Sequence, residues 1–161
     1  MACSAELTAT ADYAELHCLS NFTFLRGASH PEELVSQAKK LAYTAIALTD
    51  ECSFAGIVRA HIQAKEEKIK LIIGSEFTFD DGLRCVFLVT SKKSYTQLSK
   101  LITLARRKAT KGSYFIDRGL VESNPPEDCL ALWLPPHPLE KIEQLLWLNV
   151  FFRKRGHIHS D

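Results

Sequence analysis

Short apolar runs alternate along the chain with segments in which apolar residues recur every three or four positions. Buried strands are predicted at 45–48 (AIAL) and 71–73 (LII), and a short extended run at 13–16 ends at His17. Strands that are apolar on both faces and alternate with helices form a parallel sheet or barrel. The pattern therefore predicts an α/β fold whose first half has the order β-α-β-α-β.

Two helices are predicted between these strands. The first has apolar residues at helical spacing over 34–42. Ser29 and Glu32 before it have the spacing of a capping box, and Pro31 lies in the expected first turn. The second helix covers 57–64 and runs into the charged sequence KEEK.

The second half of the chain begins with a hairpin signal. Two apolar runs flank Asp80-Asp81-Gly82, a sequence that is typical of a tight turn between strands. Periodicity then predicts a helix around 95–105, a strand at 129–134 and a helix at 139–152.

Polar residues stand where three successive strands end: His17, Asp50 and Glu76. In parallel α/β folds the carboxyl ends of the strands carry the chemistry. Imidazole and carboxylate together can bind a divalent metal, and such metals often serve phosphoester hydrolysis. The spacing alone favours a structural interpretation over a metal site, in which Asp50 caps the next helix and Glu76 pairs with a nearby cation.

The amino-acid composition excludes some classes of protein for this chain. The 161 residues include 20 Lys and Arg against 19 Asp and Glu, with 46% hydrophobic residues and a mean hydropathy of −0.07. These values argue against a chain that is disordered throughout. The net charge is only +1, so there is no large excess of basic residues that would point to nucleic-acid binding. No apolar stretch reaches the roughly 20 residues of a membrane span, so no membrane contact is expected.

Two further features leave their function open. The basic stretch Arg106–Lys111 is either a solvated helix end that complements the helix dipole or a phosphate contact. The cysteines are odd in number and scattered, which favours free thiols in a reducing cytosol over disulfides or a zinc site. They are Cys3, Cys18, Cys52, Cys85 and Cys129.

The segments 13–35, 45–65 and 71–77 resemble the start of a PHP (polymerase-and-histidinol-phosphatase) domain. This domain stands at the N terminus of bacterial C-family DNA polymerases. The amino-acid sequence of these segments is most similar to the error-prone, damage-inducible branch of that family. The segments 95–114 and 130–136 resemble that branch too. The resemblance implies an incomplete, distorted seven-stranded (β/α) barrel that contains only the early βα units.

The family builds a metal cluster from short motifs, and most of these motifs are altered in this sequence. Four positions depart from the family's ligands: Leu19 and Glu51 for histidines, Arg26 for an aspartate, and Cys85 for a histidine. Only His17 and Glu76 remain as family ligands, with Asp50 as a neighbour. Leucine cannot coordinate, and arginine adds a permanent positive charge. The resemblance therefore predicts a module without phosphoesterase activity and without a resident zinc or manganese.

The resemblance implies that the chain is an N-terminal fragment of an error-prone DNA polymerase, which acts in translesion synthesis and damage-induced mutagenesis. The family's polymerase aspartates, and the Mg²⁺ that they hold, are expected outside this chain, so no catalytic or cofactor-binding residue is assigned here. The implied partners are DNA, dNTPs, the remainder of the polymerase, a sliding clamp and accessory mutagenesis proteins. The implied location is the cytoplasm.

Two alternatives stay open. One is a stand-alone metal-dependent PHP phosphoesterase, which would need His, Asp and His where Leu19, Arg26 and Glu51 stand. The other is a non-catalytic interaction fragment left from a disrupted gene.

The expected organisation is an N-terminal tail (1–12), a partial PHP domain (13–152) and a C-terminal tail (153–161) that departs from the family pattern. That tail contains His157-Ile158-His159, which has the spacing of a metal pair but is expected to be an adventitious binder at most. A truncation or frameshift near Phe152 would leave an open sheet edge and an uncovered apolar face.

Overall fold

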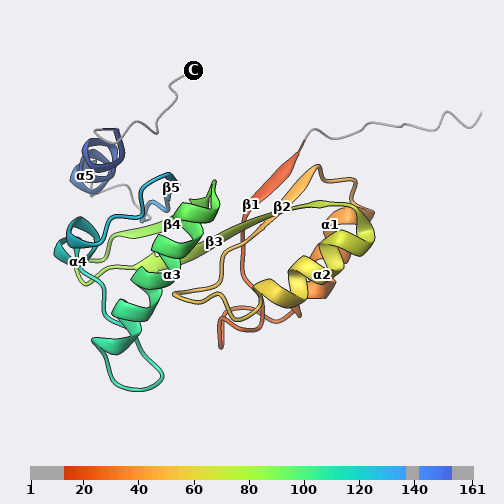
Figure 1. Cartoon of the computed structure of the whole chain (residues 1–161), viewed down its shortest axis with the longest axis horizontal. Coiled ribbons are helices and arrows are strands. Elements are labelled where there is room, and N and C mark those ends of the chain that lie inside the picture. The colour runs from red at the N-terminus through yellow and green to blue at the C-terminus, as the bar shows by residue number, and fades with distance from the viewer. Residues whose placement is uncertain (1–12, 137–141, 154–161) are drawn as a thin grey trace, which may run out of the picture.

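One curled five-stranded sheet organises the protein (Figure 1). The computed structural model describes residues 13–136 and 142–153. The strands are β1 (Ala14–Cys18), β2 (Ala45–Leu48), β3 (Lys70–Thr78), β4 (Arg84–Val89) and β5 (Cys129–Trp133), and they lie side by side in that order. The helices are α1 (Pro31–Lys40), α2 (Ile57–Glu67), α3 (Lys92–Arg107), α4 (Arg118–Ser123) and α5 (Ile142–Arg153).

The first three strands are parallel, as the alternating pattern predicts. Each is linked to the next by a helix, and α1 and α2 pack against each other beside this part of the sheet (Figure 1). The predicted capping box is displaced by one residue. The residue before α1 is His30, whose backbone N–H donates to Oε2 of Glu33 at 2.8 Å. Pro31 takes the first helical position, where its missing N–H has no cost.

The second half of the sheet is antiparallel, and the predicted hairpin about Asp80-Asp81-Gly82 is confirmed. β3 and β4 pair antiparallel, with Glu76 opposite Val86 and Thr78 opposite Arg84. The reason is the short connection, because parallel strands need a long crossover. Gly82 has φ of 81°, a conformation that favours glycine in a tight turn. β5 then pairs antiparallel with β4.

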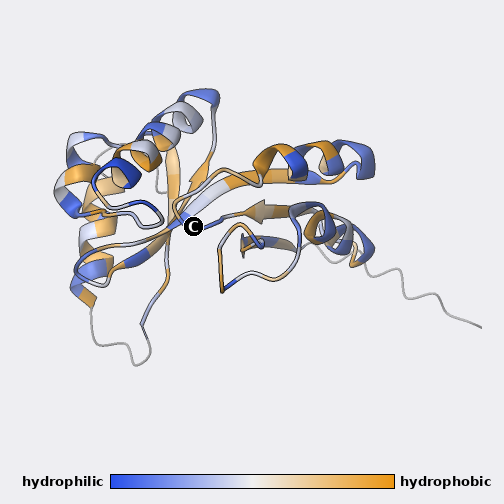
Figure 2. Ribbon diagram, turned by 90° about the horizontal axis from the view of Figure 1, so that it is seen from below, coloured by the Kyte–Doolittle hydropathy of each residue, from blue (hydrophilic) through white to orange (hydrophobic). Residues whose placement is uncertain are grey.

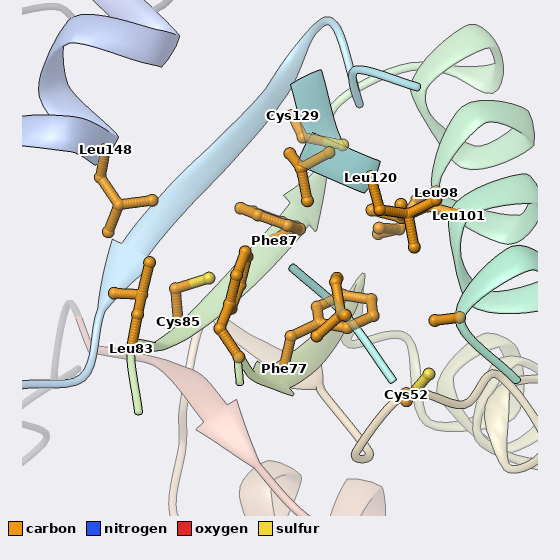
Figure 3. Close-up of a cluster of buried hydrophobic side chains, with 14 of the residues drawn as sticks. Cys52, Phe77, Leu83, Cys85, Phe87, Leu98, Leu101, Leu120, Cys129 and Leu148 are labelled. Carbon is orange, nitrogen blue, oxygen red and sulfur yellow. The ribbon is translucent and has the colours of Figure 1, made fainter. Parts of the chain in front are cut away.

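The main apolar core lies between the β3–β5 part of the sheet and the later helices. Phe77 and Phe87 contact each other there, with ring centroids 5.4 Å apart. Leu98 and Leu101 come from α3 and Leu148 from α5 (Figure 3). A second cluster joins α1 and α2 to β2. Figure 2 shows apolar residues along the strands and hydrophilic residues at helix ends and in connections.

β1 and β5 are the outer strands of the described sheet. Ala47, Val86 and Leu88 form a small third cluster, with partly buried Ile72 and Leu132 against it. Within 13–136 and 142–153, none of the helices combines the length and apolar character of a membrane span. The tails at 1–12 and 154–161, with His157 and His159, lie outside the described residues.

Candidate functional site

The structure brings His17 and Glu76 together, as their positions in the sequence suggest. His17 lies on β1 and Glu76 on β3, and Nε2 of His17 is 2.8 Å from Oε2 of Glu76. Glu76 is fully buried. It stands inside β3, which continues to Thr78, and its neighbour across the sheet edge is Glu51. The two carboxylates and the imidazole thus converge where the parallel strands end.

Two guanidinium groups pair with the buried carboxylate of Glu76. Nη2 of Arg84 is 2.7 Å from Oε1, and Nη2 of Arg26 is 3.0 Å from the same oxygen. Arg26 also contacts Oε2 at 3.1 Å, so both oxygens of Glu76 accept charged hydrogen bonds. Such bonds are the strong ones in proteins. The structural interpretation, in which Glu76 pairs with a nearby cation, is therefore confirmed.

These cations hold the pKa of Glu76 far below its ordinary value. Burial alone would raise this pKa, because it disfavours the charged form. Hydrogen bonds from His17 and Arg84 and the charges of Arg26 and Arg84 outweigh burial and lower the pKa to about 2. Glu76 is therefore ionised at neutral pH.

Arg26 bridges two carboxylates. Its Nη1 is 2.7 Å from Oε2 of Glu51, while its Nη2 reaches Glu76. The loop that presents Arg26 is tightly closed, because a Cβ on Gly27 would lie 1.9 Å from the carbonyl oxygen of Ser20. One guanidinium thus stands between Glu51 and Glu76, in the place where the sequence departs from the family's aspartate.

Glu51 has a second partner on its other oxygen. The hydroxyl of Tyr114 donates to Oε1 of Glu51 at 2.7 Å. Burial, and then this hydrogen bond, raises the pKa of Tyr114, which keeps the phenol protonated. Arg106 lies over the Tyr114 ring and donates to the carbonyl oxygens of Glu51 and Cys52 at 3.1 Å. Arg106 therefore supports the segment that carries Glu51.

Asp50 has a different role from His17 and Glu76. Its carboxylate accepts from the backbone N–H and the hydroxyl of Ser20 at 2.8 and 2.7 Å, and from the hydroxyl of Thr23 at 2.7 Å. It does not cap the next helix, because the residue before α2 is Gly56. Asp50 instead ties the loop after β1 to the end of β2, so the helix-cap alternative is wrong.

Cys85 lies away from the site although its neighbour Arg84 is in it. Successive side chains of a strand point to opposite faces, and Cys85 is fully buried in the main core (Figure 3). Burial raises the pKa of its thiol. Cys18, Cys52, Cys85 and Cys129 are free thiols, as the sequence predicts.

The residues that converge here do not fit a divalent-metal cluster. Within the described part of the chain, His, Cys, Asp and Glu side chains form no group of three or more that is placed to hold a metal ion. Both oxygens of Glu76 already pair with guanidinium groups, and Arg26 contributes a charge of the same sign as a metal. An ion-pair cluster of His17, Arg26, Glu51, Glu76 and Arg84 stands at this place, and is called the Glu76 cluster below.

Two members of the site were missed in the sequence, namely Arg84 and Tyr114. A signal for Arg84 did exist. Closing the predicted hairpin about Asp81-Gly82 puts residue 86 opposite Glu76, and residue 84 is then its diagonal neighbour on the same face. Tyr114 follows α3 and meets Glu51 only through the tertiary packing, so no local signal pointed to it.

Comparison with known proteins identifies the family. The family model described as PHP domain matches residues 15–158. This chain belongs to the PHP domain family. Its PHP fold is similar in part to a solved structure from Bifidobacterium adolescentis that is assigned by name to the metal-dependent phosphoesterases. That match has a TM-score of 0.51 and 25% identity, over 60% of this chain and 34% of the other.

Curated relatives of this PHP chain carry the name error-prone DNA polymerase. The relative from Methylococcus capsulatus is 58% identical over 155 residues, which is 96% of this chain but 14% of that protein. The relative from Dechloromonas aromatica is 58% identical over 128 residues, which is 77% of this chain and 12% of that protein. The chain therefore corresponds to the N-terminal region of such polymerases and spans about one seventh of their length.

The low pKa of Glu76 predicts a specific loss of stability in acid. A carboxylate whose pKa is about 2 in the folded protein and near 4.5 when unfolded stabilises the fold above about pH 5. That contribution, about 3 kcal/mol for a fully buried group, is lost as the pH falls to about 2. Urea titrations at a series of pH values should show a shallower acid dependence for Glu76→Gln than for the wild type. Equal acid dependence in the two proteins would contradict the prediction.

Proposed function

We propose that this chain forms the N-terminal PHP region of an error-prone DNA polymerase that acts in damage-induced mutagenesis and translesion synthesis. The proposal is supported by two relatives of that name that are each 58% identical to the chain. The polymerase reaction is template-directed nucleotidyl transfer and belongs to the whole protein. DNA, dNTPs, Mg²⁺, a sliding clamp and accessory mutagenesis proteins are its proposed partners, in the cytoplasm. No residue of this chain is assigned to that reaction.

Within such a polymerase, the proposed role of the PHP region is structural. The observation that carries this role is the carboxylate of Glu76, which is fully buried and paired with Arg26, Arg84 and His17. A carboxylate saturated in this way has no free oxygen for a metal and cannot act as a base at neutral pH. It can, however, join β1, the loop that carries Arg26, β3 and β4. The Glu76 cluster thus holds these elements together by ion pairing.

The test is metal binding and hydrolysis by the purified chain. After metal removal, titration calorimetry with Zn²⁺ and Mn²⁺ is expected to give no stoichiometric binding. Hydrolysis of p-nitrophenyl phosphate should not exceed that of a Glu76→Gln control, and a primer-extension assay should give no extension. Stoichiometric metal together with hydrolysis that is lost in Glu76→Gln would overturn the structural role.

A stand-alone phosphoesterase is the second candidate, and the likeness to the Bifidobacterium adolescentis structure favours it. The same assays separate the two candidates. This candidate is weaker because Leu19, Arg26 and Glu51 occupy positions where the family resemblance places metal ligands.

A further inference from the structure

Charge is distributed very unevenly along this chain. Residues 82–116 contain eight of the 20 Lys and Arg and none of the 19 Asp and Glu. The other residues therefore carry 12 cations against all 19 acidic residues, although the net charge is only +1. A sign asymmetry of this kind indicates a nucleic-acid contact more than the overall charge does.

Most of these cations belong to α3 and the turn after it. The structure shows which of them have a hydrogen-bond or ion-pair partner and which do not. Lys93 pairs with Glu127 and Lys108 with Asp117, while Arg106 is bound to backbone carbonyl oxygens. Lys100, Arg107 and Lys111 are exposed, and the described residues provide no ion-pair partner for any of them.

Lys92, at the start of α3, is likewise exposed and has no ion-pair partner among the described residues, and the other three unpaired cations lie further along the chain. Lys100 and Arg107 are seven positions apart with exposed Thr103 between them, so they share a face of α3. Lys111 follows four residues later, in the turn beyond the helix end, and the three cations are called the stripe below. The helix dipole explains cations in the last turn only, and Lys100 lies about two turns earlier. An external anion explains the whole stripe.

An aromatic pocket begins where the stripe ends. It has a volume of about 420 Å³ and is lined by Phe22, Thr23, Phe24, Glu51, Arg106 and Tyr114, with Gly112 and Ser113 directly after Lys111. Phe24 is unusually exposed to solvent for an aromatic residue, with 83% of its surface accessible. A planar base can stack on such a ring, and stacking is independent of sequence.

We propose that this surface binds single-stranded nucleic acid, with phosphates along Lys100, Arg107 and Lys111 and a base in the pocket at Phe24. Proteins generally bind single-stranded nucleic acid in this way, with cations that follow its phosphate backbone and exposed aromatic rings that stack on its bases. The inference goes beyond the proposed structural role, because Lys100, Arg107, Lys111 and Phe24 lie outside the Glu76 cluster, although Glu51 of that cluster also lines the pocket. Its failure would leave that role untouched.

The test is fluorescence anisotropy with the purified whole chain and a fluorescein-labelled oligo(dT) of about 16 nucleotides. With three phosphate contacts, affinity should fall about 20-fold between about 50 and 200 mM salt. The triple variant Lys100→Ala/Arg107→Ala/Lys111→Ala should lose this salt dependence and most of the affinity. The matched control Lys39→Ala/Lys40→Ala/Lys65→Ala removes the same charge from the exposed ends of α1 and α2 and should bind like the wild type.

A second pair of variants tests the base contact. Phe24→Ala should weaken single-strand binding about fivefold or more, because one stacked base is lost. Leu25→Ala removes a side chain that is also largely exposed (89%) but has no ring, and should have little effect. All the substituted side chains are exposed, so melting curves should show intact folds.

The proposal is overturned by equal losses in the two triple variants, or by no binding at about 50 mM salt. Binding of a duplex of the same length as tightly as the single strand, unchanged by Phe24→Ala, overturns it as well.

Discussion

Replacing both Arg26 and Arg84 by alanine is expected to lower the free energy of unfolding by about 3 kcal/mol at neutral pH. The fully buried carboxylate of Glu76 would keep only His17 as a partner. A buried charge without compensation is costly, and the pKa of Glu76 should rise as a result. We take the lower end of the usual range because both arginine side chains are partly exposed. Urea unfolding followed by circular dichroism measures the effect.

Two controls separate this effect from a loss of surface charge. Arg59 pairs with Glu32 at an exposed position between α2 and α1, so Arg59→Ala should cost less than about 1 kcal/mol. Adding Glu76→Gln to the double variant removes the uncompensated charge and should recover part of the lost stability. A double variant as stable as Arg59→Ala would show that the Glu76 cluster does not hold the strand ends together.

Phe87→Ala is expected to destabilise the protein by about 3–5 kcal/mol, the largest effect of any single substitution considered. The Phe87 side chain is fully buried on β4 and lies 5.4 Å, centroid to centroid, from both Phe77 and Phe152. Its removal leaves a cavity between the sheet and the later helices (Figure 3). Thermal unfolding should show a fall in melting temperature on the order of 10 °C for a chain of this size.

Phe24→Ala is the matched control for this core substitution. The chemical change is the same, but Phe24 is 83% exposed, so stability should change by less than about 0.5 kcal/mol. Phe87→Leu should give an intermediate loss, because it keeps most of the buried apolar volume. Similar losses for Phe24→Ala and Phe87→Ala would contradict the assignment of the main core.

Local pattern was enough to place most elements of the sheet. The strands at 45–48 and 71–73 and the turn at Asp80-Asp81-Gly82 appear in the structure close to where the sequence predicts them. Short apolar runs and turn residues act over a few positions, and they predict elements well for that reason. The N-cap of α1 was misplaced by one residue, from Ser29 to His30, because two candidate Glu residues stand side by side.

The candidate site divides in the same way. The sequence by itself predicted that His17 and Glu76 lie at the same edge of the sheet and that Leu19 and Arg26 stand where the family has metal ligands. Only the tertiary structure decided which cations reach Glu76, since Arg26 is 50 residues from it in the chain. It also decided that Asp50 binds Ser20 and Thr23 instead of joining the site. Contacts between residues that are distant in the chain depend on how the helices and strands pack, and a local sequence pattern contains no information about that packing.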